Sequence, residues 1–252
     1  MCMAILKPSN KPIFKRKLHE CWTSNPDGAG FMWSHNKTLY IRKGFMTFRK
    51  FYRTFRAMER DFPEADFAIH FRIATHGGVN GDNCHPFKIA GHNVGVIHNG
   101  ILSVTIPNKY QSDTSYFCSE ILSKFPKGWM YNPAWVSMLN KYAQGEFSKF
   151  IVMDCFGKWI IFNESAGEWE DGLWYSNKSY GFAKYNPKYN WENEYPLAKS
   201  YLALRNYDVE CALCFGKFDY NDIKWFGGQQ LCCDCYQYQK EAEECAGRIS
   251  SP

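Results

Sequence analysis

The most informative part of the sequence is residues 70–100, which read HFRIATHGGVNGDNCHPFKIAGHNVGVIHNG. Residues 67–75 and 93–98 are typical of buried strands, and the glycine-rich GGVNGDNCHP between them predicts a loop. Arg72 lies in the first strand, and Asn99-Gly100 follows the second. An arginine binds a carboxylate through paired hydrogen bonds, and an asparagine with the next backbone N–H can stabilise an oxyanion. The stretch therefore predicts a binding site for an amino acid.

The overall composition indicates a packed globular protein. The chain has 252 residues, which is enough for one good-sized core or for one domain plus a small appendage. Aromatic residues make up 18% of the chain, which argues against disorder. No run of eighteen apolar residues occurs, and MCMAIL gives way at once to KPSNKPIFKRK, so we expect neither a membrane span nor a signal peptide. Cytoplasmic localisation follows. A net charge of +5 permits an anionic partner such as nucleic acid without requiring one.

Strand-like and helix-like patterns alternate along the chain, which predicts an α+β protein. Residues 13–43 look like short extended pieces around a turn at residues 25–28. Apolar spacing predicts helices at residues 48–58 and 133–143, and Ser112 can cap a third helix beginning at Asp113. Residues 147–164 favour a hairpin that turns at Phe156-Gly157, and residues 173–177 favour a further strand.

The C-terminal residues carry four cysteines at metal-binding spacing. Cys211 and Cys214 form one CxxC pair, Cys232 and Cys235 form another, and 17 residues separate the pairs. Two CxxC turns complete a tetrahedral zinc site with Zn–S distances of about 2.3 Å. Four thiolates leave no open coordination position, so we expect a structural zinc in a domain over residues 206–247. Cys233 is an alternative to Cys232 in this ligand set.

A metal site formed by histidines is another interpretation of the sequence. We do not favour it, because the spacing of the histidines matches no common metal site. They are His70, His76, His85, His92 and His98.

Five motifs together resemble the class II glutamine amidotransferases, which are N-terminal-nucleophile hydrolases, and Cys2 stands at the nucleophile position. The resemblance covers roughly residues 2–176. The motifs, in chain order, are Asp27-Gly28-Ala29-Gly30, His70-Phe71-Arg72-Ile73-Ala74-Thr75-His76-Gly77, Asn83-Cys84-His85-Pro86, His98-Asn99-Gly100 and Ser112-Asp113-Thr114.

The resemblance implies a four-layer αββα sandwich over residues 2–195 and a role for each matching residue. Cys2 is then the nucleophile, and Asn99 with the Gly100 amide forms the oxyanion hole. Arg72 binds the α-carboxylate of glutamine and Asp113 binds its α-ammonium group. The remaining pocket residues that the resemblance implies are Thr75, His76 and Gly77.

Two positions depart from the family pattern. Many members have glycine after the nucleophile, where this chain has Met3, and many synthases have an arginine where Ser24 and Asn25 stand. Both differences shift the expectation away from the sugar- and purine-pathway synthases. Neither removes a group that the chemistry requires.

The expected function is that of a glutamine-hydrolysing amidotransferase subunit that needs no cofactor for catalysis. Its ammonia would pass to an acceptor handled by a partner synthase docked through the zinc domain, or to a modified nucleobase. An alternative is a γ-glutamyl amide hydrolase without an acceptor. The non-enzymatic alternative is a zinc-stabilised binding protein built on a decayed hydrolase fold.

Overall fold

The computed structural model describes residues 2–74, 78–108 and 110–178 and, in the C-terminal part, residues 209–210, 212, 217–218, 223–226, 229–232, 235–237 and 240. The chain divides into two compact units, one made of Met1–Ile13 with Lys17–Tyr185 and the other of Phe14–Arg16 with Asn186–Pro252. The predicted domain limits at residues 195 and 206 lie outside the described residues. Among the described helices, none has the length and apolar character that a bilayer crossing requires.

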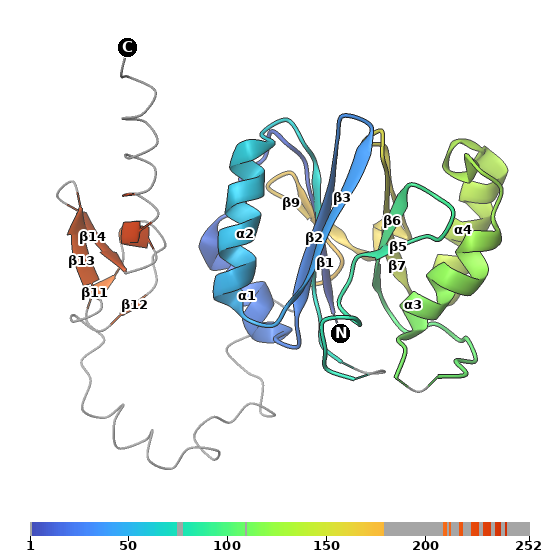
Figure 1. Cartoon of the computed structure of the whole chain (residues 1–252), viewed down its shortest axis with the longest axis horizontal. Helices are drawn as coiled ribbons and strands as arrows, with labels where there is room; N and C mark the ends of the chain where they lie inside the picture. Colours follow the sequence, from blue (N-terminus) through green and yellow to red (C-terminus); the bar gives the residue numbers. More distant parts are fainter. Residues whose placement is uncertain are drawn as a thin grey trace. The chain divides into compact units, whose positions relative to one another are not determined.

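Two antiparallel sheets form the first unit (Figure 1). The six-stranded sheet has the order β3 (Thr38–Phe45), β2 (Ala29–His35), β4 (Phe67–Phe71), β1 (Met3–Lys7), β10 (Leu173–Tyr175) and β9 (Glu168–Glu170). The four-stranded sheet has the order β5 (Phe87–Lys88), β6 (Val94–Asn99), β7 (Lys149–Asp154) and β8 (Trp159–Phe162).

The described α-helices vary in length from four to fourteen residues. The α-helices are α1 (Lys15–Ser24), most of which belongs to the first unit, α2 (Phe48–Asp61), α3 (Asp113–Tyr116) and α4 (Pro133–Gly145). Single helical turns span Phe117–Ile121, Leu122–Lys124, Trp129–Tyr131 and Glu164–Ala166.

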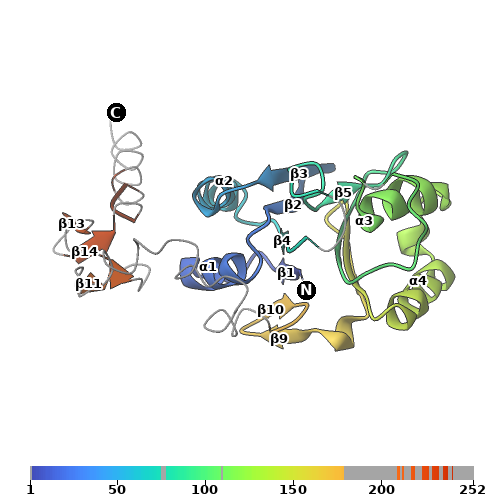
Figure 2. The ribbon, with the colours of Figure 1, turned by 90° about the horizontal axis from the view of Figure 1, so that it is seen from below.

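The helices lie on the outer faces of the two sheets, which face each other (Figures 1 and 2). Alternation along the strands produces this arrangement, because successive side chains point to opposite faces of a sheet. In β1, Ile5 packs with Phe51 and Phe55 of α2, whereas Leu6 packs between the sheets. Three apolar clusters result, one between the sheets and one under the helices on each outer face.

The second unit contains two described hairpins. Strands β11 (Val209–Glu210) and β12 (Lys217–Phe218) form one, and β13 (Ile223–Phe226) and β14 (Gln229–Cys232) form the other. Leu231, Cys232 and Cys235 are buried together. A pair of cysteines is thus held in a small apolar cluster.

The α+β prediction is confirmed, and so are most predicted elements. The predicted helices at residues 48–58 and 133–143 are α2 and α4, and the predicted hairpin is β7–β8. The prediction for residues 13–43 was wrong at its start, because Lys15–Ser24 forms α1. Only Leu18 and Cys21 of α1 are buried. A helix that buries so few residues has almost no apolar periodicity to detect.

We predict that Phe51→Ala lowers the free energy of unfolding by about 3–5 kcal/mol, because it removes a buried ring and leaves a cavity. The Phe51 side chain is fully buried and contacts the rings of Phe31, Phe45 and Phe71. Denaturant unfolding measures the change. The exposed Lys50→Ala in the same helix is the control, with an expected change within about 0.5 kcal/mol.

Candidate active site

Strand pairing places Cys2 beside the segment that follows β4. Strands β1 and β4 are antiparallel with Met3 opposite Phe71, so Cys2 and Arg72 lie next to each other at the same end of this strand pair. The Cys2 thiol donates to the Ile73 carbonyl at 3.4 Å and accepts from the Ile73 N–H at 3.4 Å. The thiol position is therefore tied to the backbone next to Arg72.

The same alternation that builds the core directs the candidate residues to one layer. Ala4 packs between the sheets, so Cys2, two residues earlier, faces that layer as well. Ile97 packs there from the opposite sheet, so Asn99, two residues later, faces the same layer. The ends of β1 and β6 thus present a thiol and a carboxamide to one region.

A small cavity brings most of the predicted site residues together. Its volume is about 20 Å³. This is room for about one water molecule. The lining residues are Cys2, Arg72, Ile73, His85, His98, Gly100, Ser112, Asp113 and Thr114.

Burial raises the pKa of the Cys2 thiol above its usual value. The hydrogen bond from Ile73 and the Arg72 cation act in the opposite direction without offsetting the burial. The thiol is therefore protonated at neutral pH, and a nucleophilic role requires a base that removes its proton.

Arg72 is 4% exposed, and the turn at residues 27–28 fixes its backbone. The Arg72 N–H donates to the Gly28 carbonyl at 2.8 Å, and the Asp27 N–H donates to the Arg72 carbonyl at 3.0 Å. The Asp27 carboxylate also accepts from the Ala74 N–H at 2.8 Å. The Asp27-Gly28-Ala29-Gly30 motif therefore positions the arginine segment.

Asp113 supplies the carboxylate of the cavity from the first residue of α3. Its Oδ2 accepts from the Leu102 N–H at 2.9 Å, and its Oδ1 accepts from the Thr114 N–H at 2.7 Å. The predicted cap is confirmed, since the Ser112 hydroxyl accepts from the Ser115 N–H at 3.2 Å. A cation and an anion thus line one small cavity, an arrangement that suits a zwitterionic amino acid.

Asn83 joins two loops beside this cavity, its own and the one that precedes α3. Its Oδ1 accepts from the Ser112 N–H at 3.1 Å, and its Nδ2 donates to the carbonyls of Gly78 and Tyr110 at 3.2 and 3.0 Å. The Arg72 Nη1 donates to the same Gly78 carbonyl at 3.1 Å. Asn83 therefore links the arginine to the start of α3.

Three buried histidines hold the end of β6. The His98 N–H donates to Nδ1 of His85 at 3.0 Å, and the His98 carbonyl lies 3.2 Å from Nε2 of His70. The His98 ring reaches the hydroxyls of Thr114 and Ser148 at 2.8 and 3.0 Å. Side chains from separate segments thus fix the backbone and the ring of the residue before Asn99.

These histidines are neutral at physiological pH. Burial lowers the pKa of His98 to about 4 and that of His70 to about 3, and it lowers the pKa of His85 well below the usual value. Among the described residues, no three His, Cys, Asp or Glu side chains are grouped to hold a metal ion. The histidines here act as neutral hydrogen-bonding groups.

Gly100 cannot carry a side chain in this structure. A Cβ there would lie 2.8 Å from Nε2 of His98 and would overlap the Ser148 hydroxyl. Asn99 is 1% exposed, and its Nδ2 donates to the Ser176 hydroxyl at 2.7 Å. Gly100 is among the residues that line the cavity, and Asn99 precedes it at the end of β6.

Several predicted site residues remain predictions. Thr75, His76 and Gly77 lie outside the described residues, as do Cys211 and Cys214. Cys232 and Cys235 are buried, 2% and 4% exposed. Two buried thiols three residues apart suit half of a zinc site.

Sequence reasoning missed two residues that hold the site in place, Ser176 and Asn177, which directly follow β10. The Ser176 hydroxyl accepts from the Ala4 N–H at 2.9 Å, and the Asn177 Nδ2 donates to the Cys2 carbonyl at 2.7 Å. Both residues lie more than 170 positions from the partners they hold. A polar Ser-Asn pair directly after an apolar strand was the available signal.

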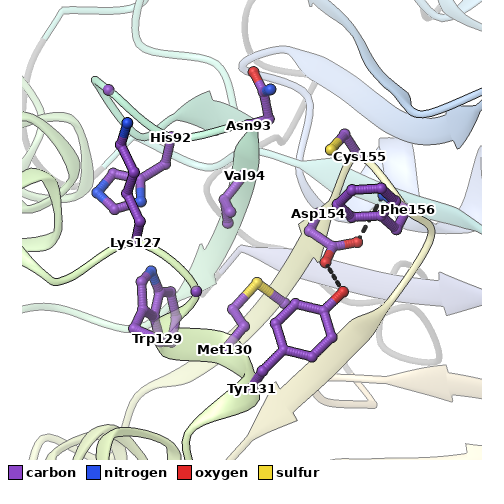
Figure 3. A pocket seen from close by; sticks show the side chains of 12 residues that line it. His92, Asn93, Val94, Lys127, Trp129, Met130, Tyr131, Asp154, Cys155 and Phe156 are labelled. Carbon is purple, nitrogen blue, oxygen red and sulfur yellow. Dashed lines mark hydrogen bonds between the residues drawn. The ribbon is translucent and has the colours of Figure 1, made fainter.

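A larger cavity of about 350 Å³ lies at the opposite end of β6, around Val94 (Figure 3). The Tyr131 hydroxyl donates to the Asp154 carboxylate there, which raises the pKa of Tyr131 to about 12. This cavity does not combine a thiol with an arginine and a carboxylate. We therefore assign the candidate active site to the smaller cavity.

We predict that acid destabilises the protein through the buried histidines. A histidine with a lowered pKa in the folded state stabilises that state fully above about pH 6.5, and this stability is lost as the pH falls toward 4. His98→Gln should therefore reduce the loss of unfolding free energy between pH 7 and 5, measured by urea unfolding. An equal loss in His98→Gln and in the wild type would contradict the prediction.

Comparison with known proteins gives a partial similarity. No protein-family model matches the chain. A stretch of 76 residues, 30% of this chain, is 36% identical to the glutamine–fructose-6-phosphate aminotransferase (isomerizing) of Chlamydia pneumoniae. The match covers 12% of that protein, so the chain corresponds to only a small part of its length.

Proposed function

We propose that the chain is a glutamine-hydrolysing amidotransferase subunit with Cys2 as its nucleophile. The main observation behind the proposal is that one cavity is lined by Cys2, Arg72, Gly100 and Asp113. The partial similarity to a glutamine-dependent aminotransferase supports it. The two facing sheets with outer helices are compatible with the αββα sandwich of N-terminal-nucleophile hydrolases.

The charges of the cavity account for substrate selection in this proposal. A free amino acid carries one carboxylate and one ammonium group, and a selective site needs one counter-charge for each. Arg72 binds the α-carboxylate, Asp113 binds the α-ammonium group, and the side-chain amide extends toward Cys2. Losing a charged hydrogen-bond partner costs about 1.5–3 kcal/mol of binding free energy.

The reaction begins with activation of the thiol. Removal of Met1 exposes the α-amino group of Cys2, whose pKa in model compounds is about 7.7–8.0. This amine supplies the base that the buried thiol requires, and it accepts the thiol proton directly or through a water molecule. The three nearby histidines are poor bases, because burial holds their pKa values below the usual range.

The thiolate then attacks the carbonyl carbon of the glutamine side-chain amide. The Gly100 N–H and the Asn99 carboxamide stabilise the oxyanion of the tetrahedral intermediate. The C–N bond breaks, the amine proton passes to the leaving nitrogen, and ammonia departs. Water hydrolyses the remaining γ-glutamyl thioester and regenerates the thiol.

A glutaminase assay tests the proposal. The wild type should release ammonia from glutamine, and Cys2→Ala should release none. Asp113→Asn and Arg72→Lys should each raise KM roughly tenfold to a hundredfold, because each loses a charged hydrogen bond to the substrate. The exposed Ser137→Ala is the control and should match the wild type.

Other outcomes of this assay separate the alternatives. Ammonia from γ-glutamyl amides but not from glutamine would support the hydrolase alternative. No ammonia from either substrate would favour the non-catalytic binding protein. Active protein that retains Met1 by intact-mass analysis would contradict the role of the free α-amine.

We also propose that the second unit binds a structural zinc ion and docks the partner that receives the ammonia. The burial of Cys232 and Cys235 fits a zinc site, which Cys211 and Cys214 would complete. Zinc supplies a cross-link that a small unit with little core requires. The partner is a synthase that handles the acceptor, and a nucleic acid with a modified base is the alternative.

We predict about one zinc ion per purified full-length chain, measured by elemental analysis. Cys232→Ser and Cys235→Ser should each lower this content, because a tetrahedral site loses one thiolate. Cys155→Ser, which changes a buried cysteine of the first unit, is the control and should retain the metal. A zinc content near zero in the wild type would overturn the assignment.

A further inference from the structure

The Ser176 hydroxyl lies where three segments of the first unit meet. It accepts from the Ala4 N–H at 2.9 Å and from the Asn99 Nδ2 at 2.7 Å. The Ser176 N–H donates to the Ala4 carbonyl at 2.9 Å, which continues the pairing of β10 with β1. Ser176 thus connects the nucleophile strand of one sheet with the end of β6 in the other.

The hydrogen bonds around Ser176 are incomplete in this arrangement. The Asn99 Oδ1 is buried and has no hydrogen-bond partner in the described part of the chain. Within the described residues, the Ser176 hydroxyl proton has the Met3 sulfur as its acceptor, at 4.0 Å. A buried carbonyl oxygen without a partner is costly, and a thioether is a weak acceptor.

Turning the Asn99 carboxamide by 180° exchanges its oxygen and nitrogen and brings the carbonyl oxygen to the Ser176 hydroxyl. The Ser176 hydroxyl then donates to Asn99 Oδ1 and still accepts from the Ala4 N–H. Nδ2 takes the former place of Oδ1, and both of its N–H groups are released from Ser176. The turned carboxamide is fully bonded only when an acceptor, such as an oxyanion, meets Nδ2.

We propose that Ser176 is a positioning residue that sets the orientation of the Asn99 carboxamide for oxyanion stabilisation. The inference rests on the proposed glutaminase function. Ser176 touches no reacting atom, since it acts through Asn99. Its position next to Ala4 also fixes the distance between the oxyanion asparagine and the strand that carries Cys2.

Steady-state glutamine hydrolysis by Ser176→Ala, Asn99→Ala and the double variant tests this role. Ser176→Ala should lower kcat roughly tenfold to a hundredfold and change KM less than about threefold, because Arg72 and Asp113 still hold the substrate. Asn99→Ala should lower kcat roughly a hundredfold to a thousandfold. The double variant should be no slower than Asn99→Ala, because two residues that act as one unit are not additive.

A merely structural role for Ser176 gives different results. Its loss would then displace Cys2, slow alkylation of the Cys2 thiol by iodoacetamide, and add to the loss caused by Asn99→Ala. We expect unchanged alkylation, because that displacement reaction forms no oxyanion. Slower alkylation, additive losses in the double variant, or unchanged kcat in Ser176→Ala would each overturn the inference.

Ammonia release by the wild type distinguishes failure of this inference from failure of the proposed function. A wild type that releases no ammonia refutes the proposed function and the inference together. An active wild type with an equally active Ser176→Ala variant refutes the inference alone. Thermal unfolding of each variant shows whether it is folded, and Ser176→Gly replaces Ser176→Ala if the latter is not.

Discussion

The pairing of β1 between β4 and β10 is the constraint on which the candidate site depends. The register with β4 brings Cys2 to Ile73 and Arg72, and the register with β10 brings Ser176 and Asn177 to the same few residues. A shift by one residue would turn every side chain of β1 to the other face. The thiol would then leave the layer between the sheets.

In the candidate site, the residues that carry charge differ from the residues that fix the backbone. Arg72 and Asp113 carry the charges that face the cavity, while the neighbouring histidines are neutral because burial disfavours their cationic form. Neutral histidines can both donate and accept hydrogen bonds, so they can fix the end of β6 without adding a charge to the cavity. Desolvation of the histidines thus leaves the charges of the cavity to Arg72 and Asp113.

Local patterns predicted much of the fold and of the candidate site, and tertiary contacts decided the rest. Cys2, Arg72, Gly100 and Asp113 were predicted from motifs, and the structure brings them to one cavity. The supporting role of Asn83 was not predicted, although its motif was identified, because its partners Tyr110 and Ser112 lie in another loop.

Ser176 and α1 were missed for related reasons. The hydroxyl of Ser176 has partners far away in the sequence, and α1 buries too few residues to show a helical period. Both depend on packing that no local pattern records.

The place of Ser176 and Asn177 in the chain has a consequence for the order of assembly. During synthesis the strand β1 is made long before β10 and the two residues after it. Cys2 and Ala4 therefore receive their last hydrogen bonds only when residue 177 has left the ribosome. The hydrogen bonds that hold the Cys2 segment are therefore complete only after β10 and Asn177 have been made.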